Sequence, residues 1–518
     1  MRKLRNLTAC ATSARRCNIL QLKRSLRLRC IVCGVFVFLL VVKFAAHAAE
    51  FSDPAPPVLA PLKEMAAPEA VANPDVKVHA KPKALPAGAV THDWLSFIGP
   101  THNAVSTETK LLKKWPAGGP TLLWEFARGT GYSSPAIQGE RLVYLHRVAG
   151  EEIVECLRPE DGARYWKFAY PTAYTDRYGY NDGPRASPVI DADRVYTFGA
   201  EGKLHCLKLT TGQLIWKRDL VSEFKVTQNF FGVGSTPLLE GDRLIINVGA
   251  PGGPGVAAFD KMTGKMLWGC DEQWGASYSS PVPATIHGKR RVFVFAGGES
   301  RPPTGGLLCI DPENGKIDFR FFWRSKTAES VNAANPVVIG NQVFISATYC
   351  TGNALLTIKP DFSFEVAWKN GEDSDNFGLH WMTPVHKDGY LYAFEGRHMQ
   401  NAGLVCYELK SGKEMWRKTI EWEDVLTVKG RQQKFRGGPF RASILQADGS
   451  YLVLGEVGHL AWLNLTPEGC TELARTWLFA AQETWSLPVV SRGLLYISQN
   501  HASNTTGPRL LCYDLRGE

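Results

Sequence analysis

The sequence lacks the short motifs that identify common hydrolases, nucleotide-binding enzymes and metalloproteins. It contains no GxSxG nucleophile elbow, no Walker loop and no HExxH pair, and these motifs carry the nucleophile, the phosphate cradle and the zinc ligands of such enzymes. It also lacks a CxxCH haem attachment, and no CxxC motif is paired with a second one or with two histidines. We therefore assign no catalytic residue and no metal ligand from the sequence.

Acidic residues are missing from the N-terminal segment. Residues 1–48 hold ten Lys and Arg but no Asp or Glu. The apolar run at 31–42 is twelve residues long, shorter than the roughly 20 residues that span a bilayer, and Ala46-His47-Ala48 offers a small-x-small cleavage site. We predict that 1–48 is a signal peptide, with an uncleaved signal anchor as the alternative. No small-residue lipobox ending in Cys follows the run, which argues against a lipoprotein.

The net positive charge of the chain belongs to this segment. The whole chain has 59 basic and 50 acidic residues and a formal charge of +9, but without residues 1–48 it has 49 basic residues and a charge of −1. A basic leader fits export and gives no argument for nucleic-acid binding. We expect an exported protein, periplasmic or associated with the cell envelope, whose only membrane contact would be an uncleaved N-terminal segment.

Residues 49–90 are dominated by Pro and Ala, with few aromatic residues. This composition cannot build a hydrophobic core, and proline-rich segments are extended. We predict a linker that lets the remaining domain, 91–518, stand off from a membrane or wall.

Five segments of the chain are versions of one phrase, in which a small residue and a short strand precede a polar-Gly turn and an aromatic residue. They are CLRPEDGARYW (156–166), CLKLTTGQLIW (206–216), AFDKMTGKMLW (258–268), CIDPENGKIDF (309–319) and CYELKSGKEMW (406–416). Upstream strand patterns extend the repeat to eight copies, each with alternating apolar residues bounded by Gly, Asp, Asn or Pro. Four antiparallel strands repeated eight times indicate an all-β fold, an eight-bladed β-propeller.

The two ends of the repeat complement each other. The eighth copy stops at LLCYDLRGE (510–518), before its last strand, whereas GGPTLLWEF (118–126) supplies such a strand with no blade of its own. We predict that this N-terminal strand completes the last blade and closes the ring.

Most cysteines of the mature chain share one position in the repeat, where blade three has Ala258. They are Cys156, Cys206, Cys309, Cys406 and Cys512. Equivalent positions in different blades should lie too far apart for a disulfide, so we interpret these residues as small buried hydrophobes. Cys270, Cys350 and Cys470 could pair, and the sequence leaves this open.

The repeat phrase resembles the tryptophan-docking repeat of pyrroloquinoline quinone (PQQ) dehydrogenases and their cofactor-free relatives, such as the BamB-like propellers. The segment HDWLSFIGPTHNAVSTETKLLKKWPAGGPTLLWEF (92–126) resembles the opening of exported PQQ-like propellers, with Ile98 where that pattern usually has Arg. If this chain is like the dehydrogenases, the resemblance implies a quinone and a calcium ion at the ring axis, with a disulfide between adjacent cysteines covering one face. The chain has no Cys-Cys pair, and its acidic cluster GEDSDNFG (371–378) lacks EF-hand spacing.

The segments that lead into the innermost strand of each blade converge on one mouth of the axial channel. They bring together Tyr132, Arg185, Tyr278, Asn332, His380, Trp381, Arg441 and Trp485. Arg185, Arg441, Trp381, Trp485 and Tyr278 are the candidates for binding a planar polyanionic ligand, because guanidinium groups suit carboxylates. Alternatively, these groups only hydrogen-bond neighbouring turns and ordered water. His380 has no visible nucleophile or carboxylate partner for acid–base catalysis.

The residues and the resemblance together favour a non-catalytic binding or assembly platform similar to BamB. We expect protein or peptide partners in the cell envelope, no nucleic acid and no cofactor. The alternative is a PQQ-dependent alcohol or sugar oxidoreductase that holds PQQ and calcium at the axial mouth.

Overall fold

The computed structural model describes residues 51–518 except 117, 272, 375–376, 429–430, 504 and 518. The predicted signal peptide, 1–48, lies outside the described residues. Within the described part of the chain, no helix is long and apolar enough to cross a membrane. Its helical segments are a four-residue helix, α1 (Leu220–Glu223), and a 3-10 turn, η1 (Met399–Asn401).

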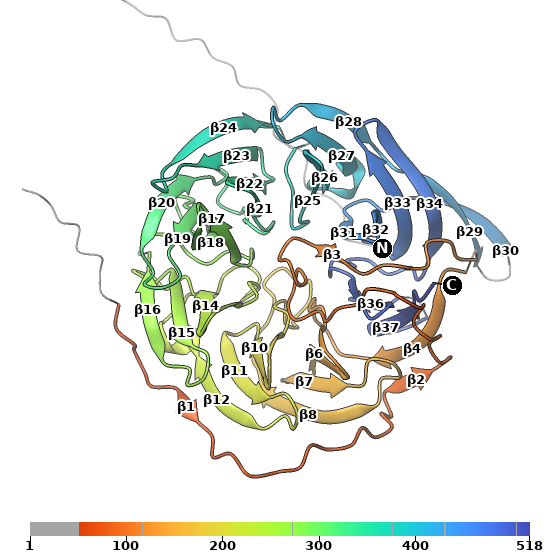
Figure 1. Cartoon of the computed structure of the whole chain (residues 1–518), viewed down its shortest axis with the longest axis horizontal. Coiled ribbons are helices and arrows are strands. Elements are labelled where there is room, and N and C mark those ends of the chain that lie inside the picture. The colour runs from red at the N-terminus through yellow and green to blue at the C-terminus, as the bar shows by residue number, and fades with distance from the viewer. Residues whose placement is uncertain are drawn as a thin grey trace, which may run out of the picture. The chain divides into compact units, whose positions relative to one another are not determined.

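Eight antiparallel sheets, arranged around an axis, form the predicted eight-bladed propeller (Figure 1). The first four blades are built as follows. Blade 1 has β5 (Ala136–Gln138), β6 (Arg141–Val148), β7 (Glu151–Leu157) and β8 (Arg164–Pro171); blade 2 has β9 (Val189–Asp191), β10 (Arg194–Phe198), β11 (Lys203–Lys208) and β12 (Leu214–Asp219); blade 3 has β13 (Leu238–Glu240), β14 (Arg243–Asn247), β15 (Val256–Asp260) and β16 (Met266–Cys270); blade 4 has β17 (Val282–Ile286), β18 (Lys289–Ala296), β19 (Gly306–Ile310) and β20 (Ile317–Phe322).

The second half of the ring repeats this order, innermost strand first. Blade 5 has β21 (Val337–Ile339), β22 (Gln342–Ala347), β23 (Gly352–Ile358) and β24 (Phe364–Asn370); blade 6 has β25 (Val385–Lys387), β26 (Tyr390–Glu395), β27 (Gly403–Glu408) and β28 (Glu414–Lys418); blade 7 has β31 (Ser443–Ala447), β32 (Ser450–Leu454), β33 (His459–Thr466) and β34 (Gly469–Trp477); blade 8 has β35 (Val489–Ser491), β36 (Leu494–Gln499), β37 (Arg509–Asp514) and, from the N-terminal side, β4 (Thr121–Ala127). β4 pairs with β37 and places Trp124 opposite Cys512.

The repeat phrase explains how neighbouring blades hold together. The indole Nε1 of Trp166 donates to the carbonyl of Leu209 in the next blade at 2.8 Å, and Trp216 donates to Lys261 at 3.2 Å. The turn glycine of the next blade lies against the indole: a Cβ at Gly212, whose φ is +72°, would come within 2.6 Å of Trp166. A Gly in the turn therefore lets the tryptophan of the preceding blade pack closely, which is why the two residues recur together.

Each blade also carries a β-bulge between its third and fourth strands. Next to the shared Cys or Ala position, one residue of the outer strand has no partner. In blade 2, Cys206 pairs with Trp216 and Leu207 pairs with Leu214, so Ile215 between them is unpaired. The same shift occurs in the other seven blades. The five repeat cysteines beside these bulges are buried, as expected for packing residues.

Residues 51–90 do not stand off as a free linker. They run along the outside of blades 3, 2, 1 and 8 in Figure 1, where β1 (Val58–Leu59) pairs with β12 and β2 (Val76–Val78) pairs with β4. An isolated bridge joins Val71 to Arg164 of β8 between them. The composition is that of an extended chain, but the outer blade edges provide hydrogen-bond partners that hold it in place; we call 51–82 the strap.

The next segment, 92–112, crosses the end of the axis at which the innermost strands finish (Figure 1). Trp94 pairs with Ile137 of β5, and β3 (Val105–Ser106) lies parallel to β31. The buried carboxylate of Glu108 accepts a hydrogen bond from the backbone N–H of Gly493 at 2.8 Å. Ile98, which replaces the usual Arg of the opening motif, is buried in this segment.

Candidate binding pocket on the ring axis

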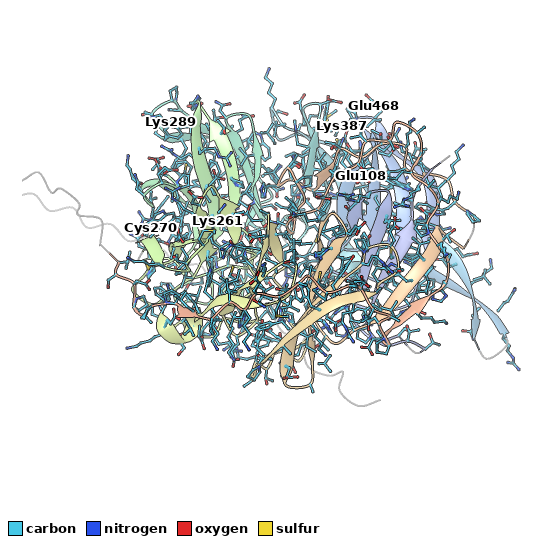
Figure 2. All side chains as sticks on the ribbon, turned by 60° about the horizontal axis from the view of Figure 1, so that its bottom comes forward. Glu108, Lys261, Cys270, Lys289, Lys387 and Glu468 are labelled. Carbon is cyan, nitrogen blue, oxygen red and sulfur yellow. The ribbon has the colours of Figure 1, made fainter. Side chains whose placement is uncertain are left out.

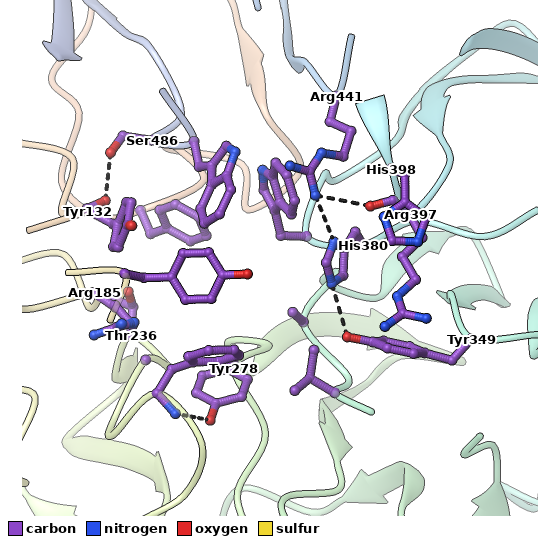
Figure 3. A pocket seen from close by; sticks show the side chains of 18 residues that line it. Tyr132, Arg185, Thr236, Tyr278, Tyr349, His380, Arg397, His398, Arg441 and Ser486 are labelled. Atoms are coloured by element: carbon purple, nitrogen blue, oxygen red, sulfur yellow. Dashed lines mark hydrogen bonds between the residues drawn. The ribbon is translucent and has the colours of Figure 1, made fainter. Parts of the chain in front are cut away.

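A cavity of about 290 Å³ lies at the other end of the axis, where the chain enters the innermost strands. All eight of these entry segments contribute to its wall. Its lining residues are Phe97, Tyr132, Tyr180, Arg185, Phe231, Gly234, Thr236, Tyr278, Val331, Ala333, Tyr349, His380, Trp381, Arg397, His398, Arg441, Trp485 and Ser486 (Figure 3). Phe97 reaches the cavity from the segment that crosses the opposite end of the axis.

The structure brings the five candidate residues from the sequence into this one cavity. Arg185, Tyr278, Trp381, Arg441 and Trp485 all line it. They come from the entry segments of blades 2, 4, 6, 7 and 8, so the convergence follows from the propeller geometry.

Asn332 is the expected mouth residue that does not line the cavity. It is buried, and its side-chain amide donates to the carbonyls of Ala296 at 2.9 Å and Trp323 at 3.3 Å. It therefore holds neighbouring turns together, as the alternative interpretation of these polar groups proposed.

Sequence analysis missed several lining residues outside the entry segments, among them Tyr180, Tyr349 and Arg397. Tyr349 follows β22 and Arg397 follows β26, so both lie in connections between the second and third strands of a blade. Tyr180 lies in the long connection between blades 1 and 2. Because alternate connections of an antiparallel blade open on the same end of the ring, these loops could have been included in the search.

Arg441 is held by a buried carboxylate. Its Nε donates to Glu456 Oε2 at 2.6 Å and its Nη2 to Oε1 at 3.2 Å. The guanidinium lies 4.7 Å from the ring centre of Trp381 and 5.4 Å from that of Trp485. Burial raises the pKa of Glu456, although the bonds from Arg441 oppose this shift. The charge of Arg441 is thus largely balanced within the protein.

Arg185 is balanced in the same way. Its Nη2 donates to the buried Asp176 at 2.6 Å and to the carbonyl of Asn181 at 3.1 Å. Its guanidinium lies 5.4 Å from the ring centre of Tyr132 and 5.7 Å from that of Phe231. Arg185 therefore contributes a fixed hydrogen-bonding fork more than a free positive charge.

Arg397 has a different environment. No acidic residue pairs with it among the described residues, and its guanidinium lies 4.1 Å from the ring centre of Tyr349. Tyr349 in turn is 3.2 Å from Nε2 of His380, whose Nδ1 is 3.4 Å from Nη1 of Arg441 (Figure 3). Arg397 is the lining cation whose charge remains available to a ligand.

His380 is a neutral hydrogen-bonding group rather than a proton carrier. Burial, followed by the nearby positive charges of Arg441 and Arg397, lowers its pKa to about 3. Because an Arg donates to Nδ1, the proton of the neutral ring sits on Nε2, which then donates to the hydroxyl of Tyr349. Near neutral pH this ring does not change its charge.

The remaining wall is aromatic. The rings of Trp381 and Trp485 are 4.6 Å apart at 43°, and Trp485 stacks on Tyr132 at 5.5 Å and 18°. The hydroxyl of Tyr132 donates a hydrogen bond to Glu483 Oε2, and the hydroxyl of Tyr278 accepts one from the backbone N–H of Phe231 at 2.8 Å. The described lining residues include no carboxylate. Aromatic walls with one free guanidinium suit a planar, anionic ligand.

Comparisons with solved structures show the propeller fold. The chain is similar to a europium-containing methanol dehydrogenase, with a TM-score of 0.56 and 12% identity over 82% of this chain and 98% of that chain. It is also similar to the quinohemoprotein alcohol dehydrogenase from Comamonas testosteroni, with a TM-score of 0.52 and 13% identity over 82% of this chain and 81% of that chain. For BamB from Moraxella catarrhalis the TM-score is 0.49 and the identity is 13%, over 77% of this chain and 98% of that chain.

Two comparisons were made at the level of sequence. A search of curated proteins gave no match. The family model described as outer membrane protein assembly factor BamB matches residues 149–417, just over half of the chain. The match spans the repeats from blade 1 to blade 6. Together with the eight four-stranded blades, it shows that this chain belongs to the BamB family of PQQ-like repeat propellers.

Proposed function

We propose that this protein is a non-catalytic binding and assembly platform, exported to the cell envelope, with a role similar to that of BamB. The observation that carries this proposal is a hairpin inserted between blades 6 and 7. Its strands, β29 (Trp422–Val428) and β30 (Arg431–Gly437), form a separate two-stranded sheet. The hairpin projects from the side of the ring in Figures 1 and 2.

The hairpin is firmly attached at its base. Nε1 of Trp422 donates to Glu472 of β34 at 2.8 Å, and Asp424 pairs with Arg475 at 2.8 Å. Phe435 stacks on Trp477 at 5.0 Å and 28°. These contacts fix one face of the hairpin against blade 7.

The other face of the hairpin is open. Val425, which is 56% exposed, lies opposite Lys434 on this face, and six of the seven residues of β30 are exposed. Neither strand pairs with another sheet within the described residues. An anchored, unpaired strand edge next to an exposed apolar side chain suits the addition of a partner's strand.

The axial pocket supports a binding role over a catalytic one. His380 stays neutral, and the carboxylates that bind lining residues all have partners: Asp176 pairs with Arg185, Glu456 with Arg441, and Glu483 with Tyr132 and His501. General acid–base catalysis needs a group that exchanges a proton near the working pH. The titratable side chains among the described lining residues are arginines, tyrosines, His398 and the low-pKa His380, with no carboxylate among them.

A site-specific photo-crosslinker tests the platform role. Placed at Val425 in cells, it should give adducts of defined mass with envelope proteins. Met262, an apolar residue with 47% exposure in a turn of blade 3, is the matched control and should give none of these adducts. Adducts that are identical at both positions, or absent from Val425, would contradict the proposal.

A second candidate function is a PQQ-dependent oxidoreductase, and the pocket chemistry favours it in one respect. Aromatic walls and the free charge of Arg397 fit the planar rings and carboxylates of a quinone. They do not fit calcium, because the lining includes no carboxylate and the described residues hold no group of three His, Cys, Asp or Glu side chains that could bind a metal. No cysteine lines the pocket to form a disulfide cover.

Titration of the purified protein with PQQ and calcium tests this candidate. Binding to the native state should raise the melting temperature by mass action. The quinone should bind saturably and should bind about tenfold more weakly to Arg397→Gln. No saturable binding at millimolar calcium, or binding that is unchanged by this substitution, would exclude the axial pocket as a quinone site.

A further inference from the structure

The strap binds two blades in the same way. In blade 2 it places Leu59 opposite the repeat tryptophan Trp216, and in blade 8 it places Val78 opposite the repeat tryptophan Trp124. In both cases a short extended stretch adds as a fifth, antiparallel strand to the outer edge of a blade. The chain thus contains two independent examples of one docking mode.

The main hydrogen bonds of this docking go to the bulge residue. The backbone N–H of Ala60 donates to the carbonyl of Ile215 at 3.0 Å, and that of His79 donates to the carbonyl of Leu123 at 2.7 Å. Ile215 and Leu123 are the residues that the register skips in blades 2 and 8. Because a bulge leaves one residue without a partner on the neighbouring strand, its carbonyl can accept from an outside chain.

The same bulge occurs in blades 4, 5 and 6, where the skipped residues are Asp318, Ala367 and Met415. Here the outer strands β20, β24 and β28 are the last strands of their sheets, with no fifth strand among the described residues. We call these three strands the open edges.

Exposed apolar side chains mark the open edges. Phe322 of β20 is 57% exposed, Val366 of β24 is 40% exposed and Met415 of β28 is 37% exposed. β24 is the least covered, since four of its seven residues are exposed, against two of five in β28. The outward surface is therefore apolar enough to gain from contact with a further strand.

We infer that the open edges bind extended segments of a partner polypeptide, by the mode that the strap uses on blades 2 and 8. The partner segment pairs antiparallel with the outer strand, with an apolar residue opposite the repeat aromatic, which is Phe319, Trp368 or Trp416. This inference rests on the proposed platform function and names the class of partner, a β-branched or leucine-rich extended peptide.

Charge adds a preference at β24. In blade 8 the residue after the repeat tryptophan is Glu125, which faces Lys77 of the strap across the pair, with 3.9 Å between Lys77 Nζ and Glu125 Oε1. The corresponding residue of β24 is the exposed Lys369, whose ammonium lies 5.0 Å from the ring centre of Trp323. A partner strand for β24 should therefore carry an acidic residue where the strap has Lys77.

A labelled peptide with the sequence of residues 73–82, but with Glu at the position of Lys77, tests this inference on the full-length protein, whose own strap remains in place. We expect saturable binding, weakened about threefold or more by Lys369→Glu. A peptide with the natural Lys should show the opposite preference between the two proteins. Displacement of the strap is disfavoured, because the Glu peptide would meet Glu125 in blade 8.

N-methylation of the peptide at the position of His79 is the backbone control, since it removes the N–H that bonds the bulge carbonyl; it should weaken binding about tenfold. No saturable binding, or an affinity that does not respond to the charge at 369 with either peptide, would overturn the inference. Crosslinking at Val425 does not depend on the open edges. Failure of the edges and failure of the platform role are thus separate results.

Discussion

The covered side of the ring, blades 8, 1 and 2, and its open side, blades 4 to 6, have the same repeat and different surroundings. On the covered side, strap residues complete the edges: Leu59 faces Trp216, and Val78 faces Trp124. On the open side, equivalent edges end with exposed side chains such as Val366. The repeat produces an outer edge in every blade, and within the described residues the strap adds a fifth strand to the outer edges of blades 2 and 8.

The axial pocket shows the same contrast on a smaller scale. Arg185 and Arg441 are paired with Asp176 and Glu456, whereas no acidic residue pairs with Arg397 among the described residues. Groups with partners inside the chain should contribute to stability, and groups without them should contribute to binding. This distinction can be tested with matched substitutions.

The largest contrast is expected between repeat tryptophans. Trp216 is fully buried under the strap, whereas Trp416 on the open side is only partly buried. Trp216→Ala should destabilise the protein by about 3–5 kcal/mol because it empties a well-packed site, and Trp416→Ala by about half as much. Thermal and denaturant unfolding of the two variants measures the difference. Equal losses would show that the strap does not add to the packing of blade 2.

The paired and unpaired arginines of the pocket should differ next. Arg441→Ala leaves the carboxylate of Glu456 buried without its partner and should cost about 3 kcal/mol. Arg397→Ala should cost less than about 1 kcal/mol, since no buried ion pair is broken. Burial already raises the pKa of Glu456. In the folded Arg441→Ala variant this carboxylate should bind a proton more readily, so the stability lost by the substitution should become smaller as the pH falls. A loss that is independent of pH would contradict this explanation.

The strap should loosen in acid. Asp53 pairs with the buried Arg218. Burial alone would raise the pKa of Asp53, but the hydrogen bonds from Arg218 and Met266 outweigh it and lower the pKa below 3.8. A lowered pKa in the folded state means that this stabilisation is present above about pH 4 and is lost as the pH falls through the folded value.

Hydrogen exchange at Ala60 measures this loosening. Asp53→Asn should increase the exchange rate at neutral pH about as much as acid does in the natural protein, corresponding to about 2 kcal/mol. In the variant, the exchange rate of the Ala60 amide should change below pH 4 only by the pH dependence that any exposed amide shows. An unchanged acid response would assign the effect to another carboxylate.

The smallest effect is expected on the open edges. Phe322→Ser and Val366→Ser remove exposed side chains and should change stability by less than about 0.5 kcal/mol. If the edges dock peptides, Val366→Ser should weaken peptide binding at β24 while leaving the melting temperature nearly unchanged. A large loss of stability would indicate that these side chains pack within the ring.

The repeat phrase predicted the blades, and the convergence of their entry segments predicted the five candidate residues at the pocket. Both follow from local patterns: alternating apolar residues, a Gly turn and a tryptophan at constant spacing. Tyr349 and Arg397 were missed because the search covered only the entry segments, although strand alternation places their loops at the same end of the ring. The course of the strap escaped because Pro and Ala describe an extended chain and do not name the surface that holds it.

The sequence by itself determined the repeating unit, the number of blades and the face on which polar and aromatic turns gather, because each depends on strand periodicity and turn chemistry within about fifty residues. Only the tertiary structure decided which arginine keeps a free charge, which edges the strap covers and which remain open. These outcomes depend on contacts between residues that lie far apart in the chain, such as Asp53 with Arg218 and Val78 with Trp124. Closing the ring sets those distances.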